Sequence, residues 1–119
     1  MKSRNMLAPA VAVLALAIVV SAAEEKFGVK VYEGAKPDKE TSEALSQMMS
    51  VQAFCYRTNY SVEKVMSFYK KESGMEFMGG DKENAMFKKG VVDVTIQNPW
   101  MNMKTGQLTK DTLISIVKH

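Results

Sequence analysis

The stretch SVEKVMSFYKK, residues 61–71, carries the clearest structural signal in this chain of 119 residues. Its apolar side chains recur at the spacing i, i+3, i+4, i+7, which places them on one face of an α-helix: Val62, Val65, Met66 and Tyr69. Ser61 is a preferred N-cap residue, and Gly74 is a typical stop signal. Because such a helix must bury its apolar face, we expect it to pack on the strands predicted on either side.

Segments with strand character flank this helix. Residues 51–58 before it are rich in β-branched and aromatic side chains, and four strands are predicted after it, over residues 75–78, 85–88, 91–97 and 113–117. The dipeptide Lys89-Gly90 is short enough to join two of these strands as a hairpin. In the strand after that dipeptide, Val and Ile alternate with polar residues, so one face is expected in the core and the other in solvent.

Two further elements come earlier in the chain. Residues 29–32 alternate apolar and polar side chains and predict a short strand. Asp38 is a suitable N-cap for a helix that runs to about Ser50, with an apolar face made of Ala44, Leu45, Met48 and Met49. The order of elements predicts an α+β fold. We expect two helices packed on one face of a mainly antiparallel sheet of four to six strands, in a single domain over residues 24–119.

Residues 1–23 have the pattern of a bacterial export signal. A positively charged start precedes an uninterrupted apolar run over residues 6–20, and three small residues end the segment. We expect cleavage after Ala23 and a periplasmic mature chain that begins at Glu24. The alternative is an uncleaved membrane anchor, which would then be the chain's only contact with the membrane. Pro9 and the absence of a following basic cluster argue against this alternative.

The composition of the mature chain argues against nucleic-acid binding and excludes an internal disulfide. Removing the signal takes away two basic residues and leaves 14 basic against 13 acidic ones, a net charge of +1. This balance does not support binding to nucleic acid. The single cysteine, Cys55, has no partner for an internal disulfide, so packing alone must stabilise an exported domain. Its apolar neighbours predict that the thiol is buried.

Signatures of catalysis and of cofactor binding are missing from the sequence. The only histidine is His119, the last residue, where chains are usually mobile. The chain has no P-loop, no Cys-x-x-Cys, no pair of His and no Asp-rich loop, so no cofactor is predicted. Asp81, Glu83 and Asp93 are catalytic candidates by residue type only, in contexts that predict solvent-facing positions. A non-catalytic role is favoured, with a small hydrolytic enzyme using Asp93 or Glu83 as an alternative.

Aromatic residues accompany the only arginine of the mature chain. Arg57 can bind a carboxylate or a phosphate through two N–H groups and can stack on aromatic rings. Three aromatic residues are candidates to complete a ligand-binding surface with it: Tyr32, Tyr60 and Trp100. The alternative is structural, because Arg57 at the end of its strand could pair with Glu33 or Asp38 and fasten the first loop.

A second hypothesis concerns methionine. Met101 and Met103 follow Trp100 closely, and thioethers are soft ligands that select Cu(I). The segment resembles part of the site of periplasmic copper-resistance chaperones, which combine two closely spaced Met with a Trp and a His. Here no His precedes Trp100, and only His119 could supply one. Binding of Cu(I) or Ag(I) by Met101 and Met103, with Trp100 over the ion, is the alternative function. Other methionines are expected to fill gaps in the core: Met48, Met66, Met75 and Met86.

Two sequence motifs lie within the predicted domain. One is a Val-Tyr-x-Gly-Ala start at residues 31–35, and the other is a Ser-x-Glu-x-Val-x-x-Phe-Tyr helix at residues 61–69. Together they resemble a family of small exported bacterial proteins of uncharacterised function, some of which are lipoproteins. The resemblance spans most of residues 29–98. It implies an α+β fold around a central helix and transfers no catalytic residue.

These observations predict an exported, periplasmic, non-catalytic domain that binds a protein partner or a small ligand. The candidate surface lies near Arg57 and its three aromatic companions. The long segment 98–111 between two predicted strands supports this prediction, since connections of that length are often functional loops.

Overall fold

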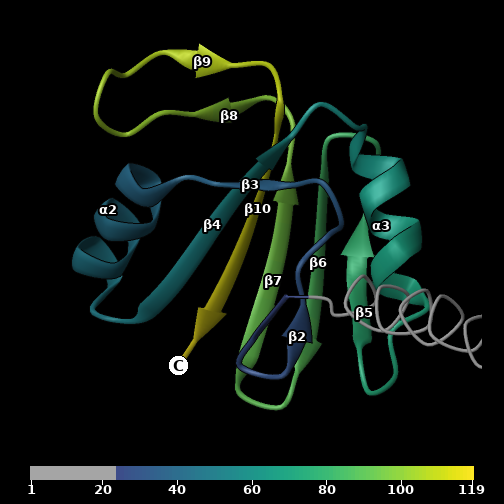
Figure 1. Ribbon diagram of the computed structural model, residues 1–119. Helices are drawn as coiled ribbons and strands as arrows, with labels where there is room; N and C mark the ends of the chain where they lie inside the picture. The colour runs from purple at the N-terminus through teal and green to yellow at the C-terminus, as the bar shows by residue number, and fades with distance from the viewer. Residues whose placement is uncertain (1–23) are drawn as a thin grey trace, which may run out of the picture.

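The computed structural model describes residues 24–119, so the predicted signal segment lies outside the described residues. Its two helices are α2 (Lys39–Met49) and α3 (Val62–Lys70). Six strands form the central sheet: β3 (Lys36–Pro37), β4 (Gln52–Thr58), β5 (Glu76–Gly80), β6 (Asn84–Lys89), β7 (Val92–Gln97) and β10 (Thr112–Lys118). Their order is β3-β4-β10-β7-β6-β5, and all neighbouring pairs are antiparallel (Figure 1). The predicted α+β class and the mainly antiparallel sheet are confirmed.

Two short hairpins lie beside the central sheet. β1 (Glu25–Lys26) pairs with β2 (Val29–Lys30), where the sequence predicted one strand over residues 29–32. β8 (Trp100–Met101) pairs with β9 (Leu108–Thr109) inside the segment that was expected to be a loop. This second hairpin projects beyond one end of the sheet, above α2 in Figure 1. β3 was not predicted, and the five remaining strands lie within two residues of their predicted bounds.

Helix α3 packs on one face of the sheet through its predicted apolar stripe. Ser61 is the N-cap, and its side chain accepts a hydrogen bond from the Lys64 amide at 3.2 Å. The buried cluster of this face joins α3 to strands β6, β7 and β10: Val62, Val65, Tyr69, Phe87, Val94, Ile96, Ile114 and Ile116. Burying each aliphatic side chain stabilises the fold by about 1.5–3 kcal/mol. This cluster is much larger than the one on the opposite face.

Helix α2 lies on the opposite face of the sheet, which corrects the expectation that both helices share one face. Its Leu45 packs with Cys55, Trp100 and Leu113. The strand residues in this set alternate with those under α3, so they point to the other side. β10 is buried from Thr112 to Val117, because α3 covers one of its faces and α2 with the β8–β9 hairpin covers the other. No residue of α2 is fully buried, so the second layer covers its face only in part.

Two serines of α2 close the edge of β4 that β3 leaves open. β3 pairs with only two residues of β4. Farther along this edge, Ser42 Oγ accepts a hydrogen bond from the Cys55 amide at 2.7 Å, and Ser46 Oγ accepts one from the Ala53 amide at 3.1 Å. Helical residues four apart are separated by about 6 Å, close to the roughly 7 Å between alternate residues of a strand. The hydroxyl groups therefore take the place of a neighbouring strand.

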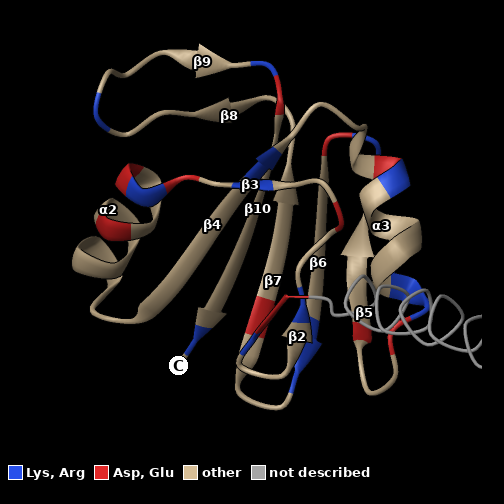
Figure 2. Cartoon of the chain, in the orientation of Figure 1, with Lys and Arg blue, Asp and Glu red and all other residues tan. Residues whose placement is uncertain are grey.

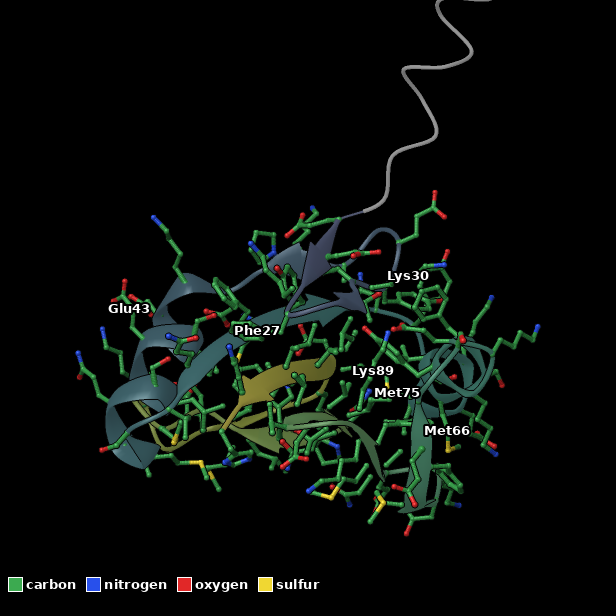
Figure 3. All side chains as sticks on the ribbon, turned by 90° about the horizontal axis from the view of Figure 1, so that it is seen from below. Phe27, Lys30, Glu43, Met66, Met75 and Lys89 are labelled. Carbon is green, nitrogen blue, oxygen red and sulfur yellow. The ribbon has the colours of Figure 1, made fainter. Side chains whose placement is uncertain are left out.

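Polar contacts fasten the β1–β2 hairpin over the α3 face. Tyr69 Oη donates a hydrogen bond to the Lys30 carbonyl at 2.8 Å, and Glu72 accepts one from the Lys30 amide at 3.2 Å. Lys89 Nζ donates to Glu72 at 3.1 Å and to the Gly28 carbonyl at 2.8 Å. Figure 3 shows Lys30 and Lys89 on the same side of the molecule. The Glu72 side chain is only 5% exposed, and Lys89, which is 32% exposed, supplies the opposite charge that a buried carboxylate requires.

Candidate functional site

Arg57 lies near the end of β4, where Asp111 and Trp100 hold its side chain. Arg57 Nε donates a hydrogen bond to Asp111 Oδ2 at 2.7 Å, and Trp100 Nε1 donates one to Asp111 Oδ1 at 2.8 Å. The guanidinium carbon lies 5.2 Å from the centroid of the Trp100 ring, within cation–π range. We call these three residues the Arg57 clamp. Asp38, one of the two partners expected for Arg57, makes a longer contact of 3.7 Å with Nη1.

Arg57 and Asp111 of the clamp line one wall of an open pocket of about 670 Å³. The pocket lies where β3, the end of β4 and the start of α2 meet. Its polar lining consists of Lys36, Asp38, Lys39, Glu40, Arg57, Asn59, Tyr60 and Asp111. Figure 2 shows the basic positions of β3 and β4 beside the mixed charges at the start of α2. We call it the Arg57–Tyr60 pocket.

The carboxylates of this pocket are already engaged within the fold. Asp38 is the N-cap of α2, and its carboxylate accepts a hydrogen bond from the Thr41 amide at 3.1 Å. Asp111 belongs to the Arg57 clamp. Glu40 lies 3.6 Å from Lys104 of the segment between β8 and β9. Asp38 and Asp111 therefore offset the charge of Arg57, and Glu40 pairs with a lysine from outside the pocket, so no carboxylate of the described lining is paired with Lys36 or Lys39.

The two lysines of the pocket remain available. Within residues 24–119, neither Lys36 nor Lys39 forms an ion pair. Arg57 directs Nε toward Asp111 and is partly exposed, so its outer N–H groups can reach a ligand. Two lysines without carboxylate partners among the described residues, beside the outer N–H groups of Arg57, offer donors on one concave surface that are suited to bind a carboxylate or a phosphate.

Two of the four predicted ligand-binding residues line the pocket, and two support it from outside. Arg57 and the exposed ring of Tyr60 are part of the lining. The Tyr32 ring packs edge-on against Tyr60, with centroids 5.9 Å apart, and against Phe68 at 5.2 Å. Burial, and then the charge of Tyr60, raises the pKa of the Tyr32 hydroxyl. Trp100 is 3% exposed, so it acts on the pocket only by holding Arg57.

The methionine candidates line one groove with His119, but they lie at the end of β10 that is away from it. Met101 and Met103 are exposed, but Arg57 lies over the Trp100 ring, where the ion was expected. The seven residues of β10 span about 23 Å between the β8–β9 hairpin and His119. In the described part of the chain, no group of three or more His, Cys, Asp or Glu is placed to hold a metal ion. Binding of Cu(I) or Ag(I) by Met101 and Met103 stays a prediction.

His119 and Asp93 form a contact at the other end of the sheet. His119 Nε2 lies 2.7 Å from Asp93 Oδ2, and the His119 amide donates a hydrogen bond to the Val91 carbonyl at 3.1 Å. The last residue is thus tied to β7, whereas the sequence predicted a mobile end. Lys88 Nζ lies 3.7 Å from Asp93 Oδ1. This cluster lies outside the Arg57–Tyr60 pocket.

The other two candidate carboxylates belong to the turn between β5 and β6. Asp81 Oδ1 accepts hydrogen bonds from the amides of Glu83 and Asn84, at 2.8 and 3.0 Å. These bonds lower the pKa of the Asp81 carboxyl. Asp81 and Glu83 are exposed, as the sequence predicted, and the contacts of Asp81 stabilise the turn.

Sequence reasoning found two lining residues of the pocket and missed several others. Lys36 and Lys39 gave no signal, because lysines are spread along the whole chain. Asp111 was also missed, although one inference could have found it. β4 and β10 are antiparallel neighbours with Arg57 opposite Leu113. This register brings Asp111, two positions before Leu113, close to the arginine. The register of the two strands had to be known first.

Comparison with protein-family models, with curated proteins and with solved structures finds no match to this chain. The site must therefore be interpreted from its own geometry. Among residues 24–119, no helix combines the length and the apolar character needed to cross a membrane.

Proposed function

We propose that this chain is an exported, non-catalytic domain that binds an anionic ligand in the Arg57–Tyr60 pocket. The observation that carries the proposal is the fixed orientation of Arg57 beside two lysines without ion-pair partners in residues 24–119. The ligand class is a carboxylate or phosphate that also carries a flat apolar group. The charged group would bind Arg57, and the flat group would stack on Tyr60.

The Arg57 clamp supports this proposal because it prepares the guanidinium group for binding. A free arginine side chain loses rotamer entropy when it binds an anion, at a cost of about 0.5–1.5 kcal/mol. Here Asp111 and Trp100 already restrict the side chain before any ligand arrives. The clamp also explains why Arg57 is suited to the position and Lys is not, since only Arg offers a planar group with further N–H donors.

Export to the periplasm is the second part of the proposal. Glu24, which would begin the mature chain, already belongs to the fold. Its carboxylate accepts a hydrogen bond from Tyr56 Oη at 2.7 Å, and its carbonyl accepts one from the Val31 amide at 2.9 Å. Cleavage after Ala23 would therefore leave the first strand of the domain in place. The expected result is an envelope-fraction protein whose N-terminal residue, identified by mass spectrometry, is Glu24.

Calorimetric titration tests the binding site. The probes are inorganic phosphate, citrate and phenyl phosphate, and we expect phenyl phosphate to bind most tightly because its ring can stack on Tyr60. Lys36→Gln and Lys39→Gln should each weaken all three probes about fivefold, since a surface charge pair contributes about 1 kcal/mol. Tyr60→Ala should weaken phenyl phosphate only.

Matched controls separate this site from general attraction of anions. Lys71 and Lys82 are exposed lysines outside the pocket lining. The variant Lys71→Gln with Lys82→Gln removes the same charge as the two pocket substitutions together. Equal weakening by the control and the pocket variants would contradict the proposal, and so would failure of all three probes to bind at millimolar concentration.

A further inference from the structure

Six of the eight methionines in residues 24–119 are exposed, by between 42% and 69%: Met48, Met49, Met78, Met86, Met101 and Met103. This corrects the expectation that Met48 and Met86 fill gaps in the core. Only Met66 and Met75 pack against the buried cluster of the α3 face, and Figure 3 shows them on the α3 side. Packing therefore does not account for the thioethers on the surface. Their shared property is access of the sulfur atom to solvent.

Three of the exposed methionines line one groove. Met49, Met101 and Met103 surround a groove of about 360 Å³ between α2, the β8–β9 hairpin and the sheet. Its lining also includes Thr95, Gln97 and His119. The hydroxyl of Thr95 and the amide of Gln97 are donors that could bind an oxygen atom added to a sulfur in this groove.

We propose that the six exposed methionines are reversible oxidation sites, which consume peroxides and hypohalous acids at the surface while the core stays intact. The sulfur lone pair attacks the electrophilic oxygen of the oxidant. A sulfur–oxygen bond forms, and the O–O bond of hydrogen peroxide or the O–Cl bond of hypochlorous acid breaks. The sulfur loses two electrons, and the oxidant leaves as water or as chloride and a proton. A methionine sulfoxide reductase can restore the thioether with two electrons from a thiol.

The arrangement of sulfur atoms explains why oxidation would spare the fold. A sulfoxide is polar, so it disrupts a core but is readily hydrated at the surface. The other reactive sulfur, Cys55, is buried and packs against Leu113 and Trp100. Burial raises the pKa of the Cys55 thiol, which keeps it protonated and a poor nucleophile. The exposed thioethers should therefore react first.

Stepwise oxidation of the full chain by hypochlorous acid, followed by peptide mass spectrometry, tests this inference. We expect up to six oxygen atoms to be taken up at the exposed methionines. Met66 and Met75 should react at least tenfold more slowly. The thermal midpoint should stay within about 3 °C until the six are consumed, and reductase treatment should remove the added oxygen. Similar rates at all eight methionines, or loss of the fold after the first oxidation, would overturn the proposal.

A second variant tests whether the exposed thioethers protect the core. Replacing all six with leucine keeps size and apolar character at exposed positions, where substitutions usually change stability by less than about 0.5 kcal/mol each. At equal oxidant, the variant should lose the Cys55 thiol and its folded signal at least threefold faster than the parent chain. Equal loss of the thiol in both proteins would show that the surface methionines give no protection and would refute the inference.

Discussion

The two faces of the central sheet are covered in different ways. On one face, α3 and the β1–β2 hairpin bury a continuous apolar cluster in which Val65, Ile114 and Ile116 are fully inaccessible. On the other face, α2 contributes no fully buried residue and is attached by Leu45 and by serine hydroxyl groups. This difference indicates that the α3 face supplies most of the free energy of unfolding. The second face keeps a pocket and a groove open to solvent.

The largest effect is expected from truncating the α3 face. Tyr69→Ala should reduce the free energy of unfolding by about 3–5 kcal/mol, because a fully buried ring is lost. Leu45→Ala on α2 should cost about 2 kcal/mol or less, since its side chain is only half-buried. Urea unfolding measures both. If Tyr69→Ala does not fold, Tyr69→Phe removes only the hydrogen bond to Lys30 and should cost about 1 kcal/mol. A larger loss from Leu45→Ala would reverse the comparison.

Alkaline pH should weaken the α3 face through its buried tyrosines. Burial, with the hydrogen bond to Glu24, raises the pKa of Tyr56, and burial, with the charge of Glu72, raises the pKa of Tyr69. Above pH about 10 the unfolded chain loses these protons while the folded chain keeps them. Stability is therefore unaffected by these groups at lower pH and then falls, by up to about 1.4 kcal/mol per pH unit for each group.

Unfolding curves between pH 8 and 11 check this sign. Tyr69→Phe should reduce the slope of the free energy of unfolding against pH by up to about 1.4 kcal/mol per pH unit, whatever its effect at neutral pH. Cys55 should also lower the stability as the pH rises, starting from a lower pH than the tyrosines, because burial raises the pKa of its thiol as well. Stability that rises with pH in this range, or a slope that Tyr69→Phe leaves unchanged, would contradict the assignment.

A smaller effect is expected where α2 closes the edge of β4. Ser42→Ala and Ser46→Ala each remove the acceptor of a backbone amide, at a cost of about 1 kcal/mol for a partly buried group. The amides of Cys55 and Ala53 should then exchange with deuterium several-fold faster. Ser67→Ala on α3 is a matched control, because this exposed serine bonds only within its own helix. Unchanged exchange in the α2 variants would show that the hydroxyl groups do not protect the edge.

Local patterns predicted the elements of this fold better than their arrangement. The stripe and N-cap of α3 and the alternation in β7 depend on near neighbours, and both were confirmed, although α3 ends at Lys70 with Lys71 as its C-cap and not at Gly74. The placement of α2 was wrong, although a signal existed. Residues 113–117 of β10 are apolar or small on both faces, which indicates a strand covered from two sides. The β8–β9 hairpin was missed, because strands of two residues are too short to show alternation.

The candidate site was likewise predicted only where single residues stand out in the sequence, and not where its contacts depend on the arrangement of the strands. Arg57 and Tyr60 could be named from the sequence because Arg57 is the only arginine of the predicted mature chain and Tyr60 follows it by three residues. The role of Trp100 could not, since its burial depends on Asp111 and on the return of the β8–β9 hairpin to the sheet. Contacts of this kind join residues that are far apart in the chain. They follow from strand register, which periodicity alone does not supply.

The smallest change in stability is expected from the Arg57 clamp, and its structural consequence is the most specific. Asp111→Asn keeps an acceptor for Trp100 but removes the charge that holds Arg57. The ion pair is partly exposed, so the free energy of unfolding should fall by no more than about 1 kcal/mol. Trp100 emission should shift to longer wavelength, because looser packing of the hairpin admits water. The amides of β8 and β9 should exchange faster.

Asp93→Asn provides the control for this prediction. Asp93 has the same residue type as Asp111, lies at the opposite end of the sheet and has a similar side-chain exposure, 21% against 19%. It pairs with His119 and contacts no part of the clamp. Its replacement should leave the Trp100 emission unchanged. If both variants shift the emission equally, the open face responds as a whole to lost charge, and the clamp has no separate role in fixing the hairpin. A shift confined to Asp111→Asn would show that one carboxylate positions the wall of the pocket on this face.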